Sequence, residues 1–327
     1  MKKIRKSPIV LFMLALILLY VIIYIVPSVT GALVSSYIVE YGELKVADEV
    51  TGYLVRNEQV YTAGTTGTAN RYIDNGTLVR KGTTVMEITG GADGEIDDKF
   101  SQIVDRLGDD AILTSDYAAT KGGVISYYAD GYERRIRPNN MKNGGYSYYS
   151  KLSQDSVQNL QRDTVVRGEP VFKVVDRTKW YIVTFVPKDH GARYKTGQDV
   201  IVEFEDGTVD AEVHSVTADV DGEHTRVILA CSNYYEKYMQ MRACPVTLVT
   251  YEERGLLVEN SSITKENGQL GVFVKKKTSG SDFVPIKVYA TDGVRSLVAD
   301  RFFDDAETGK RYDTVEIYDE VLKEPKN

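Results

Sequence analysis

Apolar and polar residues alternate over short stretches along most of this chain, and turn pairs such as Asp206-Gly207 and Asp221-Gly222 separate several of the stretches. Alternation with a period of two is typical of strands that bury one face, and an Asp-Gly pair between two strands is a strong hairpin signal. The pattern therefore predicts a mainly β protein. The expected strands are residues 36–46, 53–56, 59–61, 67–73, 84–88, 180–186, 199–205, 208–217, 225–230, 271–276, 284–290, 296–302 and 314–318.

One apolar pattern occurs twice, 86 positions apart, and reads V-x-x-G-x-x-V-x-x-[I/V] around Gly82 and around Gly168. An apolar strand that starts with a glycine precedes each copy, at Gly52 and at Gly123. We interpret the four residues as turn glycines of a duplicated β-unit. Internal repetition of this kind fixes the architecture and favours a binding or spacing module over an enzyme.

Residues 94–107 follow a different period, since Ile96, Phe100, Ile103 and Leu107 recur about every 3.6 positions. Acidic residues at 95, 97 and 98 fall in the expected first turn, where they favour the helix dipole. The pattern predicts one short amphipathic helix, which either lies on its own β-domain or contacts a partner helix. Residues 132–163 are polar and turn-rich, with a candidate short helix within 147–160.

The N-terminal part contains an uncharged apolar stretch, residues 8–26, which is long enough to cross a bilayer. Lys2, Lys3, Arg5 and Lys6 precede it, and the positive-inside rule then places the N-terminus in the cytoplasm. We expect a cytoplasmic tail at 1–7, an uncleaved signal anchor in the cell membrane at 8–29, and an extracytoplasmic remainder. A cleaved secretory signal is the alternative.

The formal net charge is −7, which argues against nucleic acid as a partner because its binders are basic. Two cysteines occur, Cys231 and Cys244, in the part expected outside the membrane. There they could form a disulfide if their strands are neighbours, or remain two small buried thiols.

Catalytic and metal-binding patterns are weak in this sequence. Residues 262–265 and 195–197 match the S-x-x-K and K-T-G motifs of penicillin-binding enzymes, but in reversed order and without S-D-N. His190, His214 and His224 lack metal-ligand spacing. We therefore expect no enzyme activity, metal or cofactor. Three neighbouring tyrosines are candidate contact residues: Tyr146, Tyr148 and Tyr149. They either contact a cell-wall sugar or a partner protein, or are ordinary half-buried aromatic residues.

The order of these features resembles HlyD-like membrane fusion proteins, the adaptor subunits of bacterial export and efflux systems. The resemblance covers residues 45–322. It lies in the half-motifs around Gly82 and Gly168, each similar to half of a lipoyl-like barrel-sandwich hybrid, and in the strands that follow. It implies hybrid halves at 46–90 and 120–177, a β-barrel at 178–250, and a membrane-proximal β-domain from 30–45 and 251–327.

The chain departs from the family pattern in two places. A long α-helical hairpin usually separates the two hybrid halves, whereas residues 91–119 allow only a short helical insertion, so docking to an outer-membrane channel is not expected. Lipoyl domains also present a lysine at the hairpin between the halves, and none lies between Ile88 and Lys99. Lipoylation is therefore not expected.

The resemblance implies a non-catalytic adaptor that packs beside an inner-membrane transporter of ABC or other efflux type, in several copies that form a ring. The missing long hairpin and the tyrosine clusters leave an alternative open. It is a cell-envelope scaffold, or a wall- or division-associated binding module, with no transport role. The sequence identifies neither the cargo nor the partner.

Overall fold

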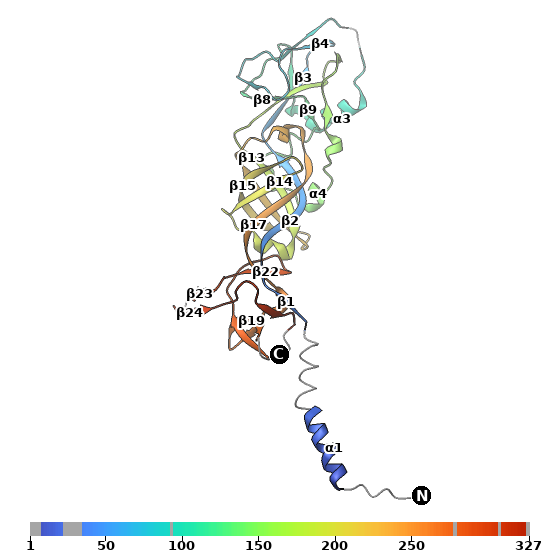
Figure 1. The fold of residues 1–327 in the computed structure, drawn as a ribbon. Coiled ribbons are helices and arrows are strands. Elements are labelled where there is room, and N and C mark those ends of the chain that lie inside the picture. Colours follow the sequence, from blue (N-terminus) through green and yellow to red (C-terminus); the bar gives the residue numbers. More distant parts are fainter. Residues whose placement is uncertain (1–7, 22–34, 92–93, 277–279, 307–308, 325–327) are drawn as a thin grey trace, which may run out of the picture. The chain divides into compact units, whose positions relative to one another are not determined.

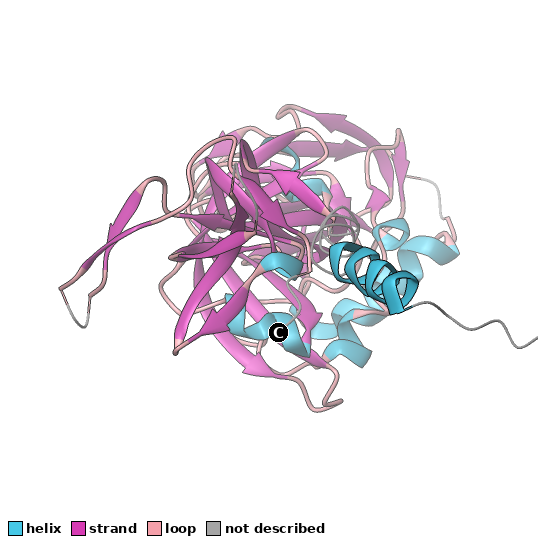
Figure 2. Ribbon diagram, turned by 60° about the horizontal axis from the view of Figure 1, so that its bottom comes forward, coloured by secondary structure: helices cyan, strands magenta, loops and turns pink. Residues whose placement is uncertain are grey.

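The computed structural model describes residues 8–21, 35–91, 94–276, 280–306 and 309–324, so the expected cytoplasmic tail at 1–7 lies outside the described residues. The chain divides into two compact units, residues 1–46 with 251–327, and residues 47–250. Most of the secondary structure of both is strand, and the helices are few and short (Figures 1 and 2). The predicted mainly β class is confirmed.

The N-terminal helix α1 (Pro8–Tyr20) is apolar throughout. Large apolar side chains on it are exposed, among them Phe12, Ile17 and Leu19. In the part of the chain that the structure describes, no helix is both long and apolar enough to span a bilayer. Residues 22–29 of the expected anchor lie outside the described residues.

The barrel-sandwich hybrid consists of two small sheets with the strand orders β5-β8-β12-β3-β7 and β11-β4-β6. Its core includes Tyr61, whose ring stacks on Phe172 with centroids 4.5 Å apart. The strands are β3 (Glu58–Ala63), β4 (Gly67–Arg71), β5 (Leu78–Val79), β6 (Met86–Thr89), β7 (Ile112–Thr114), β8 (Gly123–Ser126), β11 (Thr164–Val165) and β12 (Pro170–Val175).

The two halves of this domain exchange strands. Strand β5 of the first half pairs with β8 of the second, and β11 of the second half pairs with β4 of the first. Within the halves the register repeats: Thr68 faces Thr89 in β4–β6, and Val124 faces Val175 in β8–β12. The duplication seen in the sequence is therefore a duplication of paired strands.

Between the halves lies the short helix α3 (Asp98–Leu107), which confirms the helical period. It begins later than expected: Asp97 is the N-cap and accepts a hydrogen bond from the Lys99 amide, so Asp98 alone of the three acids lies in the first turn. Its apolar side chains are buried in the core of the hybrid domain. These are Phe100, Ile103 and Leu107. The helix thus lies on its own β-domain, the first of the two alternatives.

The second half contains an insertion between β9 (Tyr128–Ala129) and β10 (Gln158–Asn159). The expected helix within 147–160 is shorter and starts earlier, as α4 (Tyr146–Tyr149), and a 3₁₀ turn follows at Gln154–Ser156. The insertion packs on the aromatic side chains Tyr53 and Phe185 and forms a separate small core with them.

The following domain is a closed six-stranded barrel, β14-β15-β16-β13-β2-β17, in which β14 also pairs with β17. The bounds are β2 (Glu40–Val55), β13 (Trp180–Pro187), β14 (Asp199–Phe204), β15 (Gly207–Ala218), β16 (His224–Cys231) and β17 (Ala243–Glu259). Buried apolar side chains such as Trp180, Val202 and Leu248 fill its interior. All four strands predicted between 180 and 230 are confirmed.

The unit formed by 1–46 and 251–327 has its own core, which includes Val39, Val272 and Val321. It contains β1 (Ser36–Ile38), β18 (Thr264–Glu266), β19 (Gln269–Lys275), β20 (Ser281–Pro285), β21 (Val288–Thr291), β22 (Arg295–Val298), β23 (Phe302–Asp304), β24 (Arg311–Asp313) and β25 (Glu320–Leu322). The single strand β1 pairs with β25, and β25 pairs with β19.

Four strand predictions in this unit need correction. Residues 36–46, 284–290 and 296–302 each split between two strands, because residue 39, residues 286–287 and residues 299–301 belong to no strand. Residues 314–318 form no strand: the buried Val315 anchors an irregular segment, and Tyr318 has a φ of 73°, which no strand residue adopts.

Candidate functional site

Two of the four repeat glycines occupy equivalent turns of the hybrid domain. Gly82 has a φ of 85° and Gly168 a φ of 92°, in the left-handed region that favours glycine. Each amide donates to a carbonyl of the other half, Gly82 to Ala119 and Gly168 to Ala63, both at 2.7 Å. These turns lock the two halves together in a reciprocal way.

The other two glycines are not turn residues, contrary to the sequence prediction. Gly52 lies inside β2 of the barrel, where a Cβ would come within 3.1 Å of Ile182 and Val246. Gly123 opens β8, where a Cβ would lie 2.6 Å from the Val175 carbonyl oxygen. Its structural counterpart in the first half is Gly67, whose Cβ would clash with the Gly90 carbonyl oxygen. Close strand approach explains these two glycines.

The three tyrosines singled out in the sequence differ in exposure. Tyr149 is buried, and its hydroxyl donates to the Met141 carbonyl at 2.9 Å, so it is not available to a ligand at the surface. Tyr146 stacks on His224 with centroids 3.9 Å apart and remains 38% exposed. Tyr148 is half-buried and lines a pocket of the insertion.

Cys231 and Cys244 are both free thiols in the structure. Cys231 ends β16, which pairs with β13 and β15, while Cys244 lies in β17. The condition for a disulfide, that the cysteines lie on neighbouring strands, is therefore not met. The second of the two alternatives, separate buried or partly buried thiols, describes them.

Six buried ionic side chains form a cluster between the hybrid domain and the barrel; we call it the ion cluster. Its members are Arg56, Glu58, Asp130, Glu133, Lys173 and Arg242, each about 1% exposed or less as a side chain. They come from both sides of the junction, since Glu58 and Lys173 lie in β3 and β12, and Arg242 immediately precedes β17.

Short contacts connect the cluster. Glu58 accepts from Lys173 Nζ at 2.6 Å through Oε1 and from Arg242 at 3.0 Å through Oε2. Arg242 Nε also donates to Asp130 at 2.6 Å, and its Nη1 donates to the Leu54 carbonyl at 3.1 Å. Three cations thus face three carboxylates, and charges this deeply buried are tolerated only when paired in this way.

The carboxylates of the ion cluster differ in their proton affinity. Burial acts to raise the pKa of Glu58, but Arg56, Lys173 and Arg242 hold it well below its usual value. Burial and then the neighbouring Asp130 raise the pKa of Glu133 to about 7. Glu133 Oε2 has no hydrogen-bond partner among the described residues. Glu133 is therefore the member whose charge changes near neutral pH.

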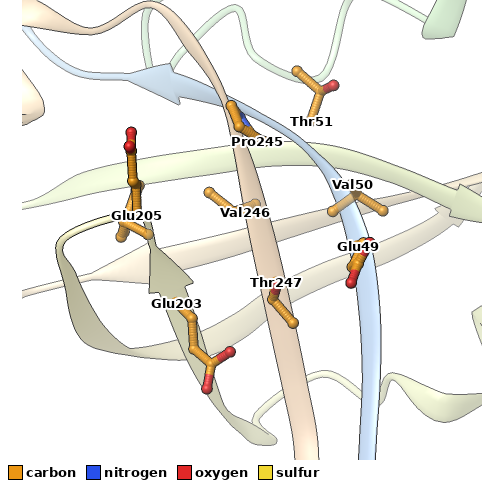
Figure 3. A pocket seen from close by; sticks show the side chains of 9 residues that line it. Glu49, Val50, Thr51, Glu203, Glu205, Pro245, Val246 and Thr247 are labelled. Atoms are coloured by element: carbon orange, nitrogen blue, oxygen red, sulfur yellow. The ribbon is translucent and has the colours of Figure 1, made fainter.

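A shallow acidic pocket of about 550 Å³ lies on the barrel wall. Figure 3 shows its side chains on three strands, with Glu49 from β2, Thr247 from β17 and Glu203 from β14. Glu205 follows directly after β14 and adds a third acid. Among the described residues no group of His, Cys, Asp and Glu has the arrangement to hold a metal ion.

Two of the three histidines contact carboxylates of the barrel. His190 Nδ1 lies 2.6 Å from the buried carboxylate of Asp48, which also accepts from Arg193 and Tyr194. His224 Nδ1 lies 2.7 Å from Asp221, in the turn that joins β15 to β16. These contacts hold the barrel's loops in place.

Two family models match consecutive parts of the chain. The first, described as an RND-related barrel-sandwich hybrid domain, matches residues 58–176, and the second, an RND-related β-barrel domain, matches residues 180–252. Together they cover more than half of the chain. No curated protein matches the sequence.

Solved structures are similar at low identity. MacA from Actinobacillus actinomycetemcomitans is 12% identical, with 89% of this chain and 100% of that chain covered and a TM-score of 0.41. ZneB from Cupriavidus metallidurans is 13% identical over 89% and 92%, with a TM-score of 0.29. The membrane fusion protein Spr0693 from Streptococcus pneumoniae R6 is 9% identical over 63% and 100%, with a TM-score of 0.30. Whole-chain superposition is loose, so the assignment depends on the two domain models.

Proposed function

Because the chain belongs to the HlyD-like membrane fusion proteins, through its RND-related hybrid and barrel domains, we propose that it is a non-catalytic adaptor of a bacterial export system. The adaptor packs beside a membrane transporter, together with further copies of itself. The observation that carries this proposal is the unbroken order of the two matched domains, 58–176 followed by 180–252.

The short insertion between the hybrid halves supports a limited reach. Helix α3 has 10 residues, about 15 Å at 1.5 Å per residue, and it buries its apolar face in its own domain. A helix packed in this way has no free apolar face for a partner helix. We infer an envelope with a single membrane, in which the adaptor works without an outer-membrane channel.

Anchoring in the cell membrane is part of the proposal. The apolar stretch at 8–26 follows four cations, and the large side chains of α1 are exposed, as lipid-facing side chains are. The N-terminus then lies in the cytoplasm and the chain after the anchor outside, by the positive-inside rule.

The absence of catalysis is also proposed, and the chemistry of the buried groups supports it. The strongest cluster of titratable residues, the ion cluster, is sealed from solvent and its charges are engaged with one another. A reacting group must reach a substrate, and these do not. Such a cluster instead suits a stiff connection between the hybrid and the barrel.

The test is affinity purification of the full-length chain from membranes in mild detergent, with mass spectrometry of bound proteins and an export assay in cells that lack the chain. We expect a polytopic transporter to co-purify and export to fall in the deleted strain, with recovery on complementation. A chain recovered without a transporter, from cells whose export is unchanged by the deletion, would contradict the proposal and favour an envelope scaffold.

A further inference from the structure

The insertion of the second half forms an open surface pocket of about 390 Å³ that the adaptor role does not use. This volume lies in the range of about 300–1,000 Å³ that small-molecule sites occupy. The insertion, residues 130–157, has no equivalent in the first half, where only a short connection joins β4 to β5. The pocket is therefore an addition to the duplicated scaffold.

Anchors on the barrel and within the insertion hold the pocket in shape. Arg226 of β16 donates to the Lys142 and Gly144 carbonyls at 2.9 and 2.7 Å. Asp219 accepts from the Tyr146 amide at 2.9 Å. Two lining residues, Ile136 and Tyr149, are buried, and the Tyr149 ring packs on Tyr53 with centroids 5.3 Å apart. Because these contacts already order the insertion, ligand binding there would cost little further conformational entropy.

The polar lining is cationic and rich in amides. Arg135, Asn140 and Asn143, all exposed, line the pocket together with the half-buried Tyr148, and no acid is among the lining residues. None of the ion pairs found among the described residues involves Arg135, whose side chain hydrogen-bonds with Tyr148. An unpaired guanidinium in an otherwise acidic protein fits an anionic group, and it pairs best with a carboxylate.

The asparagine amides and the tyrosine ring of the lining indicate which kind of molecule the carboxylate belongs to. Carboxamides donate and accept, so they suit hydroxyl and acetamido groups. A tyrosine ring presents an apolar face next to a polar tip, which suits the mixed surface of a sugar ring. We propose that this pocket binds an acidic saccharide, with its carboxylate on Arg135 and its ring beside Tyr148.

The experiment measures binding of monosaccharides to the full-length protein by calorimetry. Glucuronic acid and N-acetylmuramic acid are the acidic probes, and glucose and N-acetylglucosamine are their neutral controls. Tighter binding of N-acetylmuramic acid would identify the wall glycan as the source, and tighter binding of glucuronic acid another acidic polymer. The acidic sugars should bind at least about tenfold more tightly than the neutral ones.

Arg135→Gln should weaken acidic-sugar binding at least about tenfold, because the charge-assisted pair is lost. Arg134→Gln is the matched control, since Arg134 is the adjacent exposed arginine outside the lining. Thermal unfolding of both variants should match the wild type. Equal binding of neutral and acidic sugars, an equal effect of both variants, absence of binding at millimolar sugar, or full competition by acetate or a tripeptide would overturn the proposal. Transporter co-purification should survive in Arg135→Gln, so this test is independent of the adaptor role.

Discussion

Arg242 holds Asp130 with two parallel hydrogen bonds, Nε to Oδ2 at 2.6 Å and the terminal nitrogen to Oδ1 at 3.1 Å, in a site with about 1% exposure. The residues are 112 positions apart, and the pair connects the insertion of the hybrid domain to the chain that enters β17. Burial acts to lower the pKa of Arg242, but Asp130 and Glu58 raise it well above its usual value. The pair therefore stays ionised throughout the working pH range.

Asp130→Asn should destabilise the full-length protein strongly, because it leaves the Arg242 guanidinium buried without its main partner. Breaking a buried pair from one side costs about 3–5 kcal/mol. Denaturant unfolding measures the loss. Asp304→Asn is the control, since Asp304 makes the same two-bond pair with Arg311 at an exposed site and should change the midpoint little. Equal effects of the two substitutions would contradict the energetic role of the ion cluster.

The stability of the protein should fall as the pH rises from 5 to 8. Glu133 has a folded-state pKa raised to about 7, so the folded state binds its proton more tightly than the unfolded chain does. That stabilisation is complete below the ordinary value near 4.5 and is lost as the pH rises through 7. The acids Glu58 and Asp130, whose pKa values are lowered, change stability only at more acidic pH.

Glu133→Gln should remove this dependence, because the amide does not titrate. The measurement is the thermal midpoint at several pH values, and the difference between wild type and variant isolates Glu133 from the histidines. A wild-type midpoint that is flat or rises relative to the variant between pH 5 and 8 would show that Glu133 is ionised throughout, and would contradict the assigned pKa.

The ion cluster could not have been found from the sequence. Its members are scattered from position 56 to 242, and buried charges carry no periodic signature of the kind that marks strands and amphipathic helices. The strands of the barrel were predictable because alternation and Asp-Gly turns are local signals, and α3 was predictable because Phe100, Ile103 and Leu107 share one face. Long-range ion pairing depends on the topology that these elements adopt together.

The sequence shows the repeat, but the structural counterpart of Gly123 in the first half is Gly67 and not Gly52. The motifs around Gly82 and Gly168 are 86 residues apart, whereas the segments that precede them are 56 residues apart. In those segments Tyr61, Ala63 and Gly67 correspond to Tyr117, Ala119 and Gly123. The insertion in the second half changes the spacing and so hides this relation in the sequence. The shared spacing Tyr-x-Ala-x-x-x-Gly was the available signal. The loss of stability caused by a Cβ at Gly123 would test whether this glycine is needed for close strand approach.

Gly123→Ala should destabilise the hybrid domain, because the new Cβ would lie 2.6 Å from the Val175 carbonyl oxygen. Overpacking of this kind costs about 1–3 kcal/mol. Gly122→Ala is the matched control, since its Cβ would stay 3.5 Å from the nearest atom, the Val79 carbonyl oxygen. Denaturant unfolding of both variants gives the comparison. If Gly123→Ala is as stable as Gly122→Ala, the close approach of β8 and β12 is wrong.

Cys231 and Cys244 should remain unbridged thiols in the mature protein, because β16 and β17 are not neighbours in the barrel. Burial raises the pKa of both thiols, that of Cys244 to about 11, so the reactive thiolate is scarce in the folded state. Iodoacetamide should therefore label the folded protein slowly, and the fully buried Cys231 more slowly than Cys244. Mass spectrometry after denaturation without reductant should show two labels, and Cys231→Ser should show one. Two labels that appear only after reduction would demonstrate a disulfide and refute the strand order of the barrel.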